Sequence, residues 1–200
     1  MIIGKNVSGN LLKRVLDYSF TVIILFLLIP VILILVIAIK ISGNGPVLYT
    51  QKRIGLYGKP FTLYKFRSMH SGSEEPGPLI SGKKDLRITR MGRFMRKHKL
   101  DEIPNFINVL KGDMSLVGPR PEQQHYIDQI IIRAPEYSKL KDVRPGITSW
   151  GQVKYGYASN VDQMIERLRY DIEYIERRSL LFDFKIAILS VGIIFRGEGV

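Results

Sequence analysis

The chain has 200 residues, of which 46% are hydrophobic and 24% are charged, so it can form one compact domain with a core and one accessory segment. Its 30 lysines and arginines against 18 acidic residues give a net charge of +12, which predicts an anionic partner such as nucleic acid, acidic lipid or a phosphorylated small molecule. The chain contains no cysteine, which excludes disulfides, thiolate zinc sites and a cysteine nucleophile.

The first predicted element is an almost purely apolar segment over residues 20–39, "FTVIILFLLIPVILILVIAI". Its length matches the roughly 20 residues that a helix needs to cross a bilayer. A cleavable secretory signal normally has a shorter apolar region followed by small residues, and neither feature is evident before Lys40. We therefore expect a retained membrane anchor.

Cations flank this segment on both sides, with Lys13 and Arg14 before it and Lys40 and Lys52 after it. Because lysine and arginine favour the cytoplasmic side of a membrane, a straight crossing would export one basic flank. Pro30 lies midway and removes a backbone donor, so a re-entrant helix over about residues 12–41, broken at Pro30, would keep both flanks inside. A straight helix that tolerates the proline is the alternative, and periodicity does not decide between them.

The composition becomes mixed and basic after residues 43–46, which places a domain boundary near residue 45. Residues 1–45 would form the anchor, and residues 46–200 a cytosolic domain at the membrane surface. Within that domain, "VLYTQKR" (47–53) and "FTLYKFR" (61–67) flank a turn-rich stretch and predict a short β-hairpin.

Helical spacing of apolar residues follows the hairpin. It predicts helices near residues 88–97, 101–112 and 159–176, the second with Pro104 in its first turn and a stop at Gly112. The last part of the chain has ten uncharged residues between Lys185 and Arg196, which is too short to cross a bilayer, so we expect a helix in the headgroup region or packed on the domain. The predicted fold is α+β, mainly helical, with interfacial amphipathic helices.

Two adjacent carboxylates, Asp101 and Glu102, begin the second of these helices within the basic stretch "KHKLDEIP". The simple interpretation is helix capping. The same helix start, close to Arg96, Lys97 and Lys99, also favours phosphate. Two carboxylates beside a phosphate would repel it unless a divalent cation intervenes, and carboxylate oxygens suit Mg²⁺. Successive helix-start residues point about 100° apart, so one carboxylate could hold metal while the other faces phosphorus.

Two further segments place an arginine next to a proline. Arg120 lies between two prolines in "LVGPRPE", and Arg144 precedes a proline in "VRPGITSW". Each guanidinium could bind phosphate oxygens with two parallel hydrogen bonds, or it could be an ordinary surface side chain on a rigid turn. Asp171, on the third predicted helix, is by spacing alone a solvated or ion-paired residue.

The ordered blocks of the chain resemble one known family. The blocks are "LKRVLDY", "GPVLYTQKRIG", "FTLYKFRSM", "RMGRFMRKHKLDEIPNFINVLKGDMSLVGPRP", "RPGITSWGQV" and "YDIEYI". They are similar to those of the bacterial sugar transferases, also called monotopic phosphoglycosyl transferases. The resemblance extends from about Lys13 to Ile194. One departure is Ile29, since many members carry serine before the membrane proline.

This resemblance implies an activity and a location. The activity is Mg²⁺-dependent transfer of a sugar 1-phosphate from a UDP-sugar to undecaprenyl phosphate, by a ping-pong mechanism through a covalent aspartyl intermediate. The location is the cytoplasmic face of the bacterial inner membrane, where a re-entrant helix in the phospholipid bilayer keeps both termini cytoplasmic. No nucleic acid partner is expected.

The same resemblance implies roles for individual residues. Asp101 corresponds to the nucleophile and Glu102 to the carboxylate linked to the metal. Further polar positions of the family correspond to Lys65, Arg96, Arg120 and Asp171, and phosphate contact is expected of the three cations. Arg144 joins the expected substrate-binding residues through its arginine–proline pair.

A second class of function competes with this enzyme. A non-catalytic module tethered to the membrane could bind acidic lipid or nucleic acid through its basic surface. Such a module would explain the charge and the anchor but not the acid pair. The stretch "KYGYASN" (154–160) differs from the Asn-Gly-Arg-like segment of several family members, so the sequence leaves the transferred sugar open.

Overall fold

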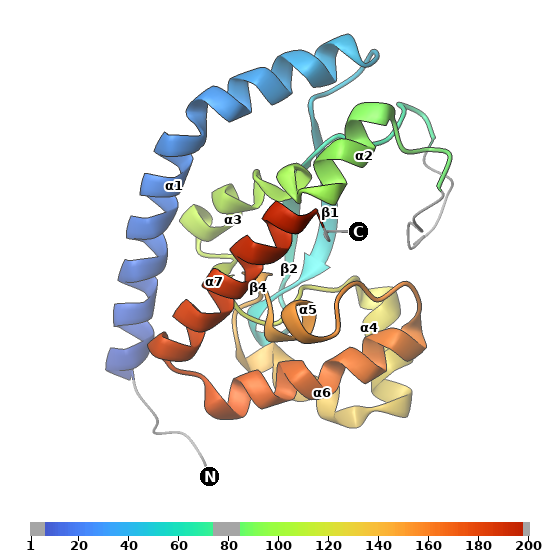
Figure 1. Cartoon of the computed structure of the whole chain (residues 1–200). Coiled ribbons are helices and arrows are strands. Elements are labelled where there is room, and N and C mark those ends of the chain that lie inside the picture. Colours follow the sequence, from blue (N-terminus) through green and yellow to red (C-terminus); the bar gives the residue numbers. More distant parts are fainter. Residues whose placement is uncertain (1–6, 74–84, 198–200) are drawn as a thin grey trace.

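The computed structural model of the chain describes residues 7–73 and 85–197 (Figure 1). The described part is mainly helical and contains two small two-stranded sheets, which confirms the predicted α+β class. The elements in chain order are α1 (Val7–Ile41), β1 (Leu48–Ile54), η1 (Leu56–Gly58), β2 (Pro60–Phe66), α2 (Arg90–Lys97), η2 (Leu100–Glu102), α3 (Asn105–Lys111), β3 (Ser115–Val117), α4 (Gln124–Arg133), η3 (Pro135–Asp142), β4 (Gly146–Thr148), α5 (Trp150–Lys154), α6 (Val161–Arg177) and α7 (Leu180–Arg196), where η marks a 3-10 helix.

The apolar N-terminal segment forms one continuous helix of 35 residues, α1, which starts earlier than the predicted residue 12. Its part from Leu11 to Ile41 is long and apolar enough to cross a membrane. Pro30 lies inside the helix, and the helix continues through it, so the predicted break is not an interruption of helical structure. Figure 1 shows that the axis of α1 changes direction partway along its length. A proline removes one hydrogen bond and crowds the preceding turn, which bends a helix without ending it.

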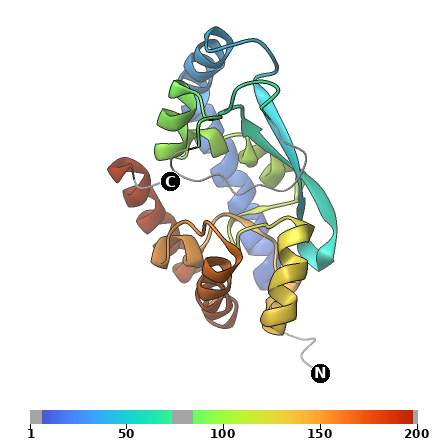
Figure 2. The same ribbon diagram turned by 90° about the vertical axis from the view of Figure 1, so that its right-hand side faces the viewer.

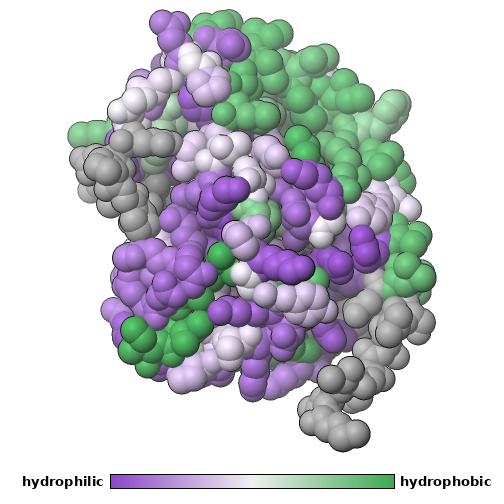
Figure 3. Space-filling view, turned by 180° about the vertical axis from the view of Figure 1, so that it is seen from behind, coloured by the Kyte–Doolittle hydropathy of each residue, from purple (hydrophilic) through white to green (hydrophobic). Residues whose placement is uncertain are grey.

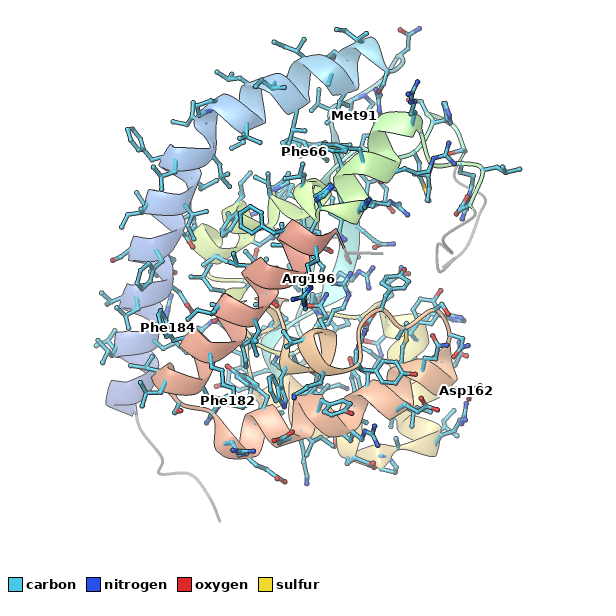
Figure 4. All side chains as sticks on the ribbon, in the orientation of Figure 1. Phe66, Met91, Asp162, Phe182, Phe184 and Arg196 are labelled. Carbon is cyan, nitrogen blue, oxygen red and sulfur yellow. The ribbon has the colours of Figure 1, made fainter. Side chains whose placement is uncertain are left out.

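The second half of α1 packs on the rest of the chain. Leu35 and Ile39 are buried against Phe66 of β2, Met95 of α2 and Ile103. The anchor and the rest of the chain therefore share one hydrophobic cluster. In Figure 4 the labelled Phe66 and Met91 mark this cluster between α1 and α2.

The outward side of α1 exposes large apolar side chains to the surroundings. Phe26 and Leu27 are 72% and 68% exposed, and they belong to a series of such residues along the helix. Seen from behind in Figure 3, hydrophobic surface covers the top and right of the molecule, where α1 lies. An apolar surface of this kind fits contact with lipid.

The predicted hairpin is confirmed as β1 and β2, which pair antiparallel from Leu48 opposite Phe66 to Ile54 opposite Pro60. Phe61 and Leu63 of β2 point inward and pack on Val109 and Met114. Because side chains alternate along a strand, Lys65 lies on the same face as these two residues. The inward face of the hairpin thus directs a lysine towards η2.

The parallel pair formed by β3 and β4 was not predicted from the sequence. Ser115 pairs with Gly146, and Val117 pairs with Thr148. The segments approach closely at Gly118 and Gly146. A Cβ on Gly146 would lie only 2.1 Å from the backbone nitrogen of Gly118, so the approach requires glycine. This sheet brings the two arginine–proline segments side by side although they are far apart in the sequence.

The remaining helices form the other side of the molecule. Met164 and Leu168 of α6 are buried among residues of α4 and η3, as the predicted apolar stripe requires. Figure 2 shows the β1–β2 hairpin along one side of the molecule and α7 along the opposite side. The predicted C-terminal helix is α7, which begins before the ten-residue apolar stretch, with Ser179 as its N-cap.

Helix α7 carries an apolar stripe on its exposed side. The residues recur three or four positions apart, and each is at least half exposed: Leu181, Phe184, Ile188, Val191 and Phe195. The spacing is that of one helical face, and the role of α7 as an amphipathic helix in the membrane interface stays a prediction.

Candidate active site

The residues of the acid pair line a cavity of about 430 Å³. Its lining includes the cationic side chains Arg53, Lys65, Arg67, Arg87, Arg96, Lys99, Arg120 and Arg167. The acidic side chains among its lining residues are Asp101, Glu102 and Glu122. Because the cations outnumber the acids, the cavity is suited to a ligand with several negative charges.

The backbone around the acid pair differs from the predicted single helix. Asp101 and Glu102 lie in the short 3-10 helix η2, and α3 begins only at Asn105, after Pro104. Lys99, immediately before η2, has a left-handed backbone with φ 52° and ψ 22°. Within the described residues neither carboxylate accepts a hydrogen bond from a helix amide, so capping does not explain the pair. Gly112 ends α3 as predicted.

Glu102 is held by two cations. Lys65 Nζ lies 2.7 Å from Glu102 Oε1, and an Nη atom of Arg120 lies 3.2 Å from the same oxygen. Glu102 is only 8% exposed, and burial acts to raise its pKa, but the charges of Lys65 and Arg120 together hold the pKa well below its usual range. Glu102 is therefore a fixed anion, and its second oxygen, Oε2, is not used by either cation.

Asp101 is equally buried, at 7% exposure, but its carboxylate is not engaged. It forms no hydrogen bond or ion pair with any residue in the described ranges, 7–73 and 85–197, although it lines the cavity. Burial raises the pKa of Asp101, and Lys65 opposes that effect. A buried carboxylate without a protein partner, facing a cavity, is available to react with or bind a ligand.

The other predicted cations divide into two groups. Arg96 lines the cavity and donates from Nε to Ser68 Oγ at 2.9 Å, so the structure brings Lys65, Arg96 and Arg120 together around the acid pair. Arg144 is not among the cavity residues, because its Nε donates to the carbonyl oxygen of Gly112 at 3.1 Å. The backbones of the two arginine–proline segments are thus adjacent, but the Arg120 guanidinium lines the cavity whereas the Arg144 guanidinium binds the carbonyl of Gly112.

Asp171 lies behind the cavity wall. It is 3% exposed, accepts a hydrogen bond of 3.2 Å from the backbone nitrogen of Gly151, and lies 3.9 Å from Nε of Arg167. Burial raises its pKa to about 6 although Arg167 acts to lower it. Of the two alternatives that the sequence left for Asp171, solvated or ion-paired, the structure shows the ion-paired one, and the contact with Arg167 places Asp171 one residue away from the cavity.

Sequence reasoning missed a second charged cluster in the cavity wall. Glu122 binds Arg53 at 3.1 Å and Arg167 at 2.7 Å, and all three line the cavity. The one available signal was the position of Glu122, directly after Arg120 and Pro121. Since the partners come from β1 and α6, only the fold shows that they meet.

The acid pair fits a magnesium ion that takes most of its ligands from elsewhere. Within the described residues there is no group of three or more histidine and acidic side chains that could form a complete metal site. Mg²⁺ commonly uses one or two carboxylates and completes its six ligands with water and substrate phosphates. The carboxylate of Asp101 and Oε2 of Glu102 could supply that protein share.

Comparison with known proteins identifies the class of molecule to which this cavity belongs. The model of the bacterial sugar transferase family matches residues 8–197. The chain belongs to that family. The expectation drawn from the sequence blocks is therefore confirmed.

Three curated relatives are similar over most of this chain. The UDP-N-acetylgalactosamine-undecaprenyl-phosphate N-acetylgalactosaminephosphotransferase of Aeromonas hydrophila is 42% identical over 188 residues, which cover 94% of this chain and 44% of the relative. The UDP-glucose:undecaprenyl-phosphate glucose-1-phosphate transferase of Escherichia coli is 40% identical over 92% of this chain and 40% of the relative. The protein of the same description from Caulobacter vibrioides is 41% identical over 92% of this chain and 70% of the relative. The chain thus spans less than half of the first two relatives.

Proposed function

We propose that this chain transfers a sugar 1-phosphate from a UDP-sugar to undecaprenyl phosphate, with Asp101 as the nucleophile. The observation that carries the proposal is the unequal state of the two adjacent carboxylates. Glu102 is held by Lys65 and Arg120, whereas Asp101 faces the cationic cavity without a partner among the described residues. A nucleophile must be free to form a bond. Asp101 meets this condition, whereas Glu102 is held in its ion pairs.

The first half of the reaction forms a covalent intermediate. An Asp101 oxygen attacks the phosphorus that carries the sugar, an Asp–O–P bond forms, and the P–O bond to the nucleotide breaks. UMP leaves with the electron pair of that bond. Arg96 and Arg120 line the cavity in which negative charge accumulates on the phosphate oxygens, and cations placed before reaction stabilise such charge.

The second half of the reaction restores the enzyme. A phosphate oxygen of undecaprenyl phosphate attacks the same phosphorus, the Asp–O–P bond breaks, and the electron pair returns to the Asp101 carboxylate. The product is undecaprenyl diphosphate sugar. Lys65 keeps Glu102 in place through both halves because their ion pair does not involve the reacting carboxylate.

Glu102, through Oε2, and Asp101 would hold Mg²⁺, which would supply positive charge to offset the negative charge of the donor diphosphate. This role is part of the proposal and rests on the fit of the two carboxylates. The relatives named above act on UDP-glucose or UDP-N-acetylgalactosamine, so these two donors are the first to test.

The proposal includes a membrane surface, because undecaprenyl phosphate keeps its long tail in lipid. The apolar side chains on the outward side of α1 and the stripe on α7 support membrane contact. Pro30 inside the bent helix α1, with basic residues on both flanks, supports a re-entrant path that leaves both termini in the cytoplasm at the inner membrane.

Replacing the nucleophile tests the proposal. Purified Asp101→Asn should release no UMP from UDP-glucose or UDP-N-acetylgalactosamine in the presence of Mg²⁺, while keeping its thermal stability and its association with vesicles. Asp128→Asn, a change on the exposed surface of α4, is the matched control and should keep full activity. UMP release by Asp101→Asn at the wild-type rate would contradict the proposal, as would the absence of a phosphosugar adduct on Asp101 in quenched samples that accumulate product.

A further inference from the structure

We propose that Lys99 binds a phosphate group of the nucleotide-sugar donor and is a substrate-binding residue of this cavity. The inference rests on the proposed function and adds to it a residue that the sequence placed only among the cations near the acid pair, without a role of its own. Two independent features of Lys99, its backbone conformation and its unpaired ammonium group, carry the argument.

The backbone of Lys99 is in the left-handed region, with φ 52°. Among the residues that the structure describes, Tyr57 is the other non-glycine residue with positive φ. Lys99 lies between His98, which caps the end of α2, and the first residue of η2. Glycine or asparagine adopts this conformation at lower free energy, so the backbone gives no reason for a lysine here. The reason must lie in the side chain.

The side chain of Lys99 lines the cavity and is partly buried. Its ammonium group has no hydrogen-bond acceptor and no carboxylate partner among residues 7–73 and 85–197. The neighbouring cavity cations are engaged: Glu102 holds Lys65 and Arg120, Glu122 holds Arg53 and Arg167, Arg87 pairs with Asp85, Arg67 donates to backbone carbonyls, and Arg96 donates to Ser68. A partly desolvated ammonium without a partner is unfavourable, which indicates that an anion completes the site.

The position of Lys99 identifies the kind of anion. It lies two residues before Asp101, and it feels the charges of both Asp101 and Glu102 without forming an ion pair with either. A phosphate that approaches Asp101 meets two carboxylates, while the charges of Lys65 and Arg120 are already shared with Glu102. Lys99 has an uncommitted positive charge beside the point of attack, and ammonium groups bind phosphate as point charges.

The chain provides a matched control in Lys97, two residues from Lys99. The sequence also placed Lys97 near the acid pair, but in the structure it is an exposed lysine in the last turn of α2 that is not among the cavity residues. Lys99→Met removes the charge and keeps a long side chain, whereas Lys99→Gly also removes the unfavourable backbone conformation. If Lys99 served only the fold, both variants at this position would leave the affinity for UDP as unchanged as Lys97→Met does. If Lys99 binds phosphate, Lys99→Gly will weaken UDP binding without lowering the melting temperature.

The test is direct binding of UDP to the full chain in lipid nanodiscs, measured by calorimetry, together with the melting temperature of each variant. We expect Lys99→Met and Lys99→Gly to weaken UDP binding by about tenfold or more, the effect of one charge-assisted hydrogen bond, and Lys97→Met to change it by less than about twofold. Lys99→Gly should melt at the same temperature as wild type or higher, because glycine tolerates the left-handed turn.

The outcome separates this inference from the catalytic proposal. Wild-type UDP affinity in both Lys99 variants overturns the inference, and so does a lower melting temperature of Lys99→Gly with unchanged affinity. Either result leaves the role of Asp101 intact if the wild-type chain releases UMP from a UDP-sugar. Conversely, UDP binding that depends on Lys99 supports the phosphate site even in a chain that fails to release UMP.

Discussion

Ser115 Oγ donates a hydrogen bond of 2.6 Å to Asp17 Oδ2, which joins β3 to helix α1 across 98 positions of the sequence. The contact belongs to a polar cluster, since Lys13 of α1 binds Asp183 of α7 at 2.6 Å and Tyr174 of α6 donates to the same carboxylate at 2.7 Å. Strand β3 leads within three residues to Arg120. The first half of α1 is thus attached to the segment that carries a cavity cation.

Removing this contact should loosen the attachment. We expect Ser115→Ala to lower the free energy of unfolding by about 1–3 kcal/mol, because a partly buried carboxylate loses its short hydrogen bond. Thermal unfolding in a mild detergent measures the change. Ser138→Ala is the control, since the exposed Ser138 bonds only to the carbonyl of Pro135 within its own turn, and it should change stability by less than about 0.5 kcal/mol. Equal stability of the two variants would show that the Asp17 contact does not hold α1.

The hairpin, helix α6 and the acid pair show where sequence reasoning succeeds. The two stretches 47–53 and 61–67 on either side of a turn-rich segment predicted the hairpin, and the helical spacing of apolar residues predicted the buried face of α6, because these patterns are local. The acid pair was visible for the same reason, as two adjacent carboxylates in a basic stretch.

Contacts between distant segments were not predictable. Strands β3 and β4 have three residues each, which is too short for a periodic signal, and their pairing decides that Arg120 lines the cavity while Arg144 supports Gly112. The burial of Asp171 and the pairing of Glu122 with Arg53 likewise depend on packing between elements far apart in the chain. Spacing along one helix cannot show which neighbour covers it.

Glu102→Gln tests the fixed anion beside the nucleophile. The change keeps the shape of the side chain but removes the charge that pairs with Lys65 and Arg120, so both cations lose their partner. We expect the rate of UMP release to fall by about a hundredfold or more, the scale of one displaced electrostatic group in an active site. Initial rates with radiolabelled UDP-sugar measure the loss. Glu136→Gln, on the exposed surface of η3, should retain the wild-type rate, and a similar rate in Glu102→Gln would exclude an electrostatic role for Glu102.

Gly92→Ala tests the close contact between α2, the helix that carries Arg96, and the backbone of Ser68. A Cβ at position 92 would lie 1.9 Å from the carbonyl oxygen of Ser68, and Ser68 also accepts the hydrogen bond from Arg96. Helix propensity alone predicts that alanine stabilises this position by about 0.5–1 kcal/mol. We expect the opposite, a loss of about 1–3 kcal/mol, because backbone must move to relieve the overlap. Denaturant unfolding decides the sign.

The control for this change is Gly192→Ala, in the interior of α7, where the nearest atom to a new Cβ is the end of the Arg196 side chain at 3.8 Å. That variant should be as stable as wild type or slightly more stable. A stabilised Gly92→Ala variant with full activity would mean that α2 can move away from Ser68 without consequence for Arg96.

The pKa of Asp171, raised to about 6 by burial and only partly opposed by Arg167, predicts a pH dependence of stability. The pKa of an unfolded aspartate is about 3.9. Between these values the folded chain binds more protons than the unfolded chain, so a rise in pH lowers the free energy of unfolding, by about 3 kcal/mol over the whole interval.

Asp171→Asn removes this contribution and keeps a group that can accept the hydrogen bond from Gly151. The stability of wild type relative to Asp171→Asn should therefore fall as the pH rises from 4 to 7, while other titrating groups, including the nearby Glu122, cancel in the comparison. Melting temperatures of both proteins at matched pH values supply the measurement. A constant difference between them would show that Asp171 titrates normally in the folded chain.

Pro30→Ala tests the path of α1 through the membrane. The chain contains no cysteine, so single cysteines at Asn10 and at the exposed Ser138 report the side of each position in sealed vesicles. We expect wild type to be labelled at both positions from the cytoplasmic side. Restoring the missing backbone donor should straighten the helix and move position 10 to the opposite side in part of the molecules.

Pro135→Ala, a change at the exposed first residue of η3, is the matched control and should leave the labelling pattern unchanged. Labelling of the wild-type positions from opposite sides would contradict the re-entrant path. If both positions stay cytoplasmic in Pro30→Ala, the bend is set by the packing of Leu35 and Ile39 on Phe66, because those contacts fix the direction of the second half of α1 whether or not the proline is present.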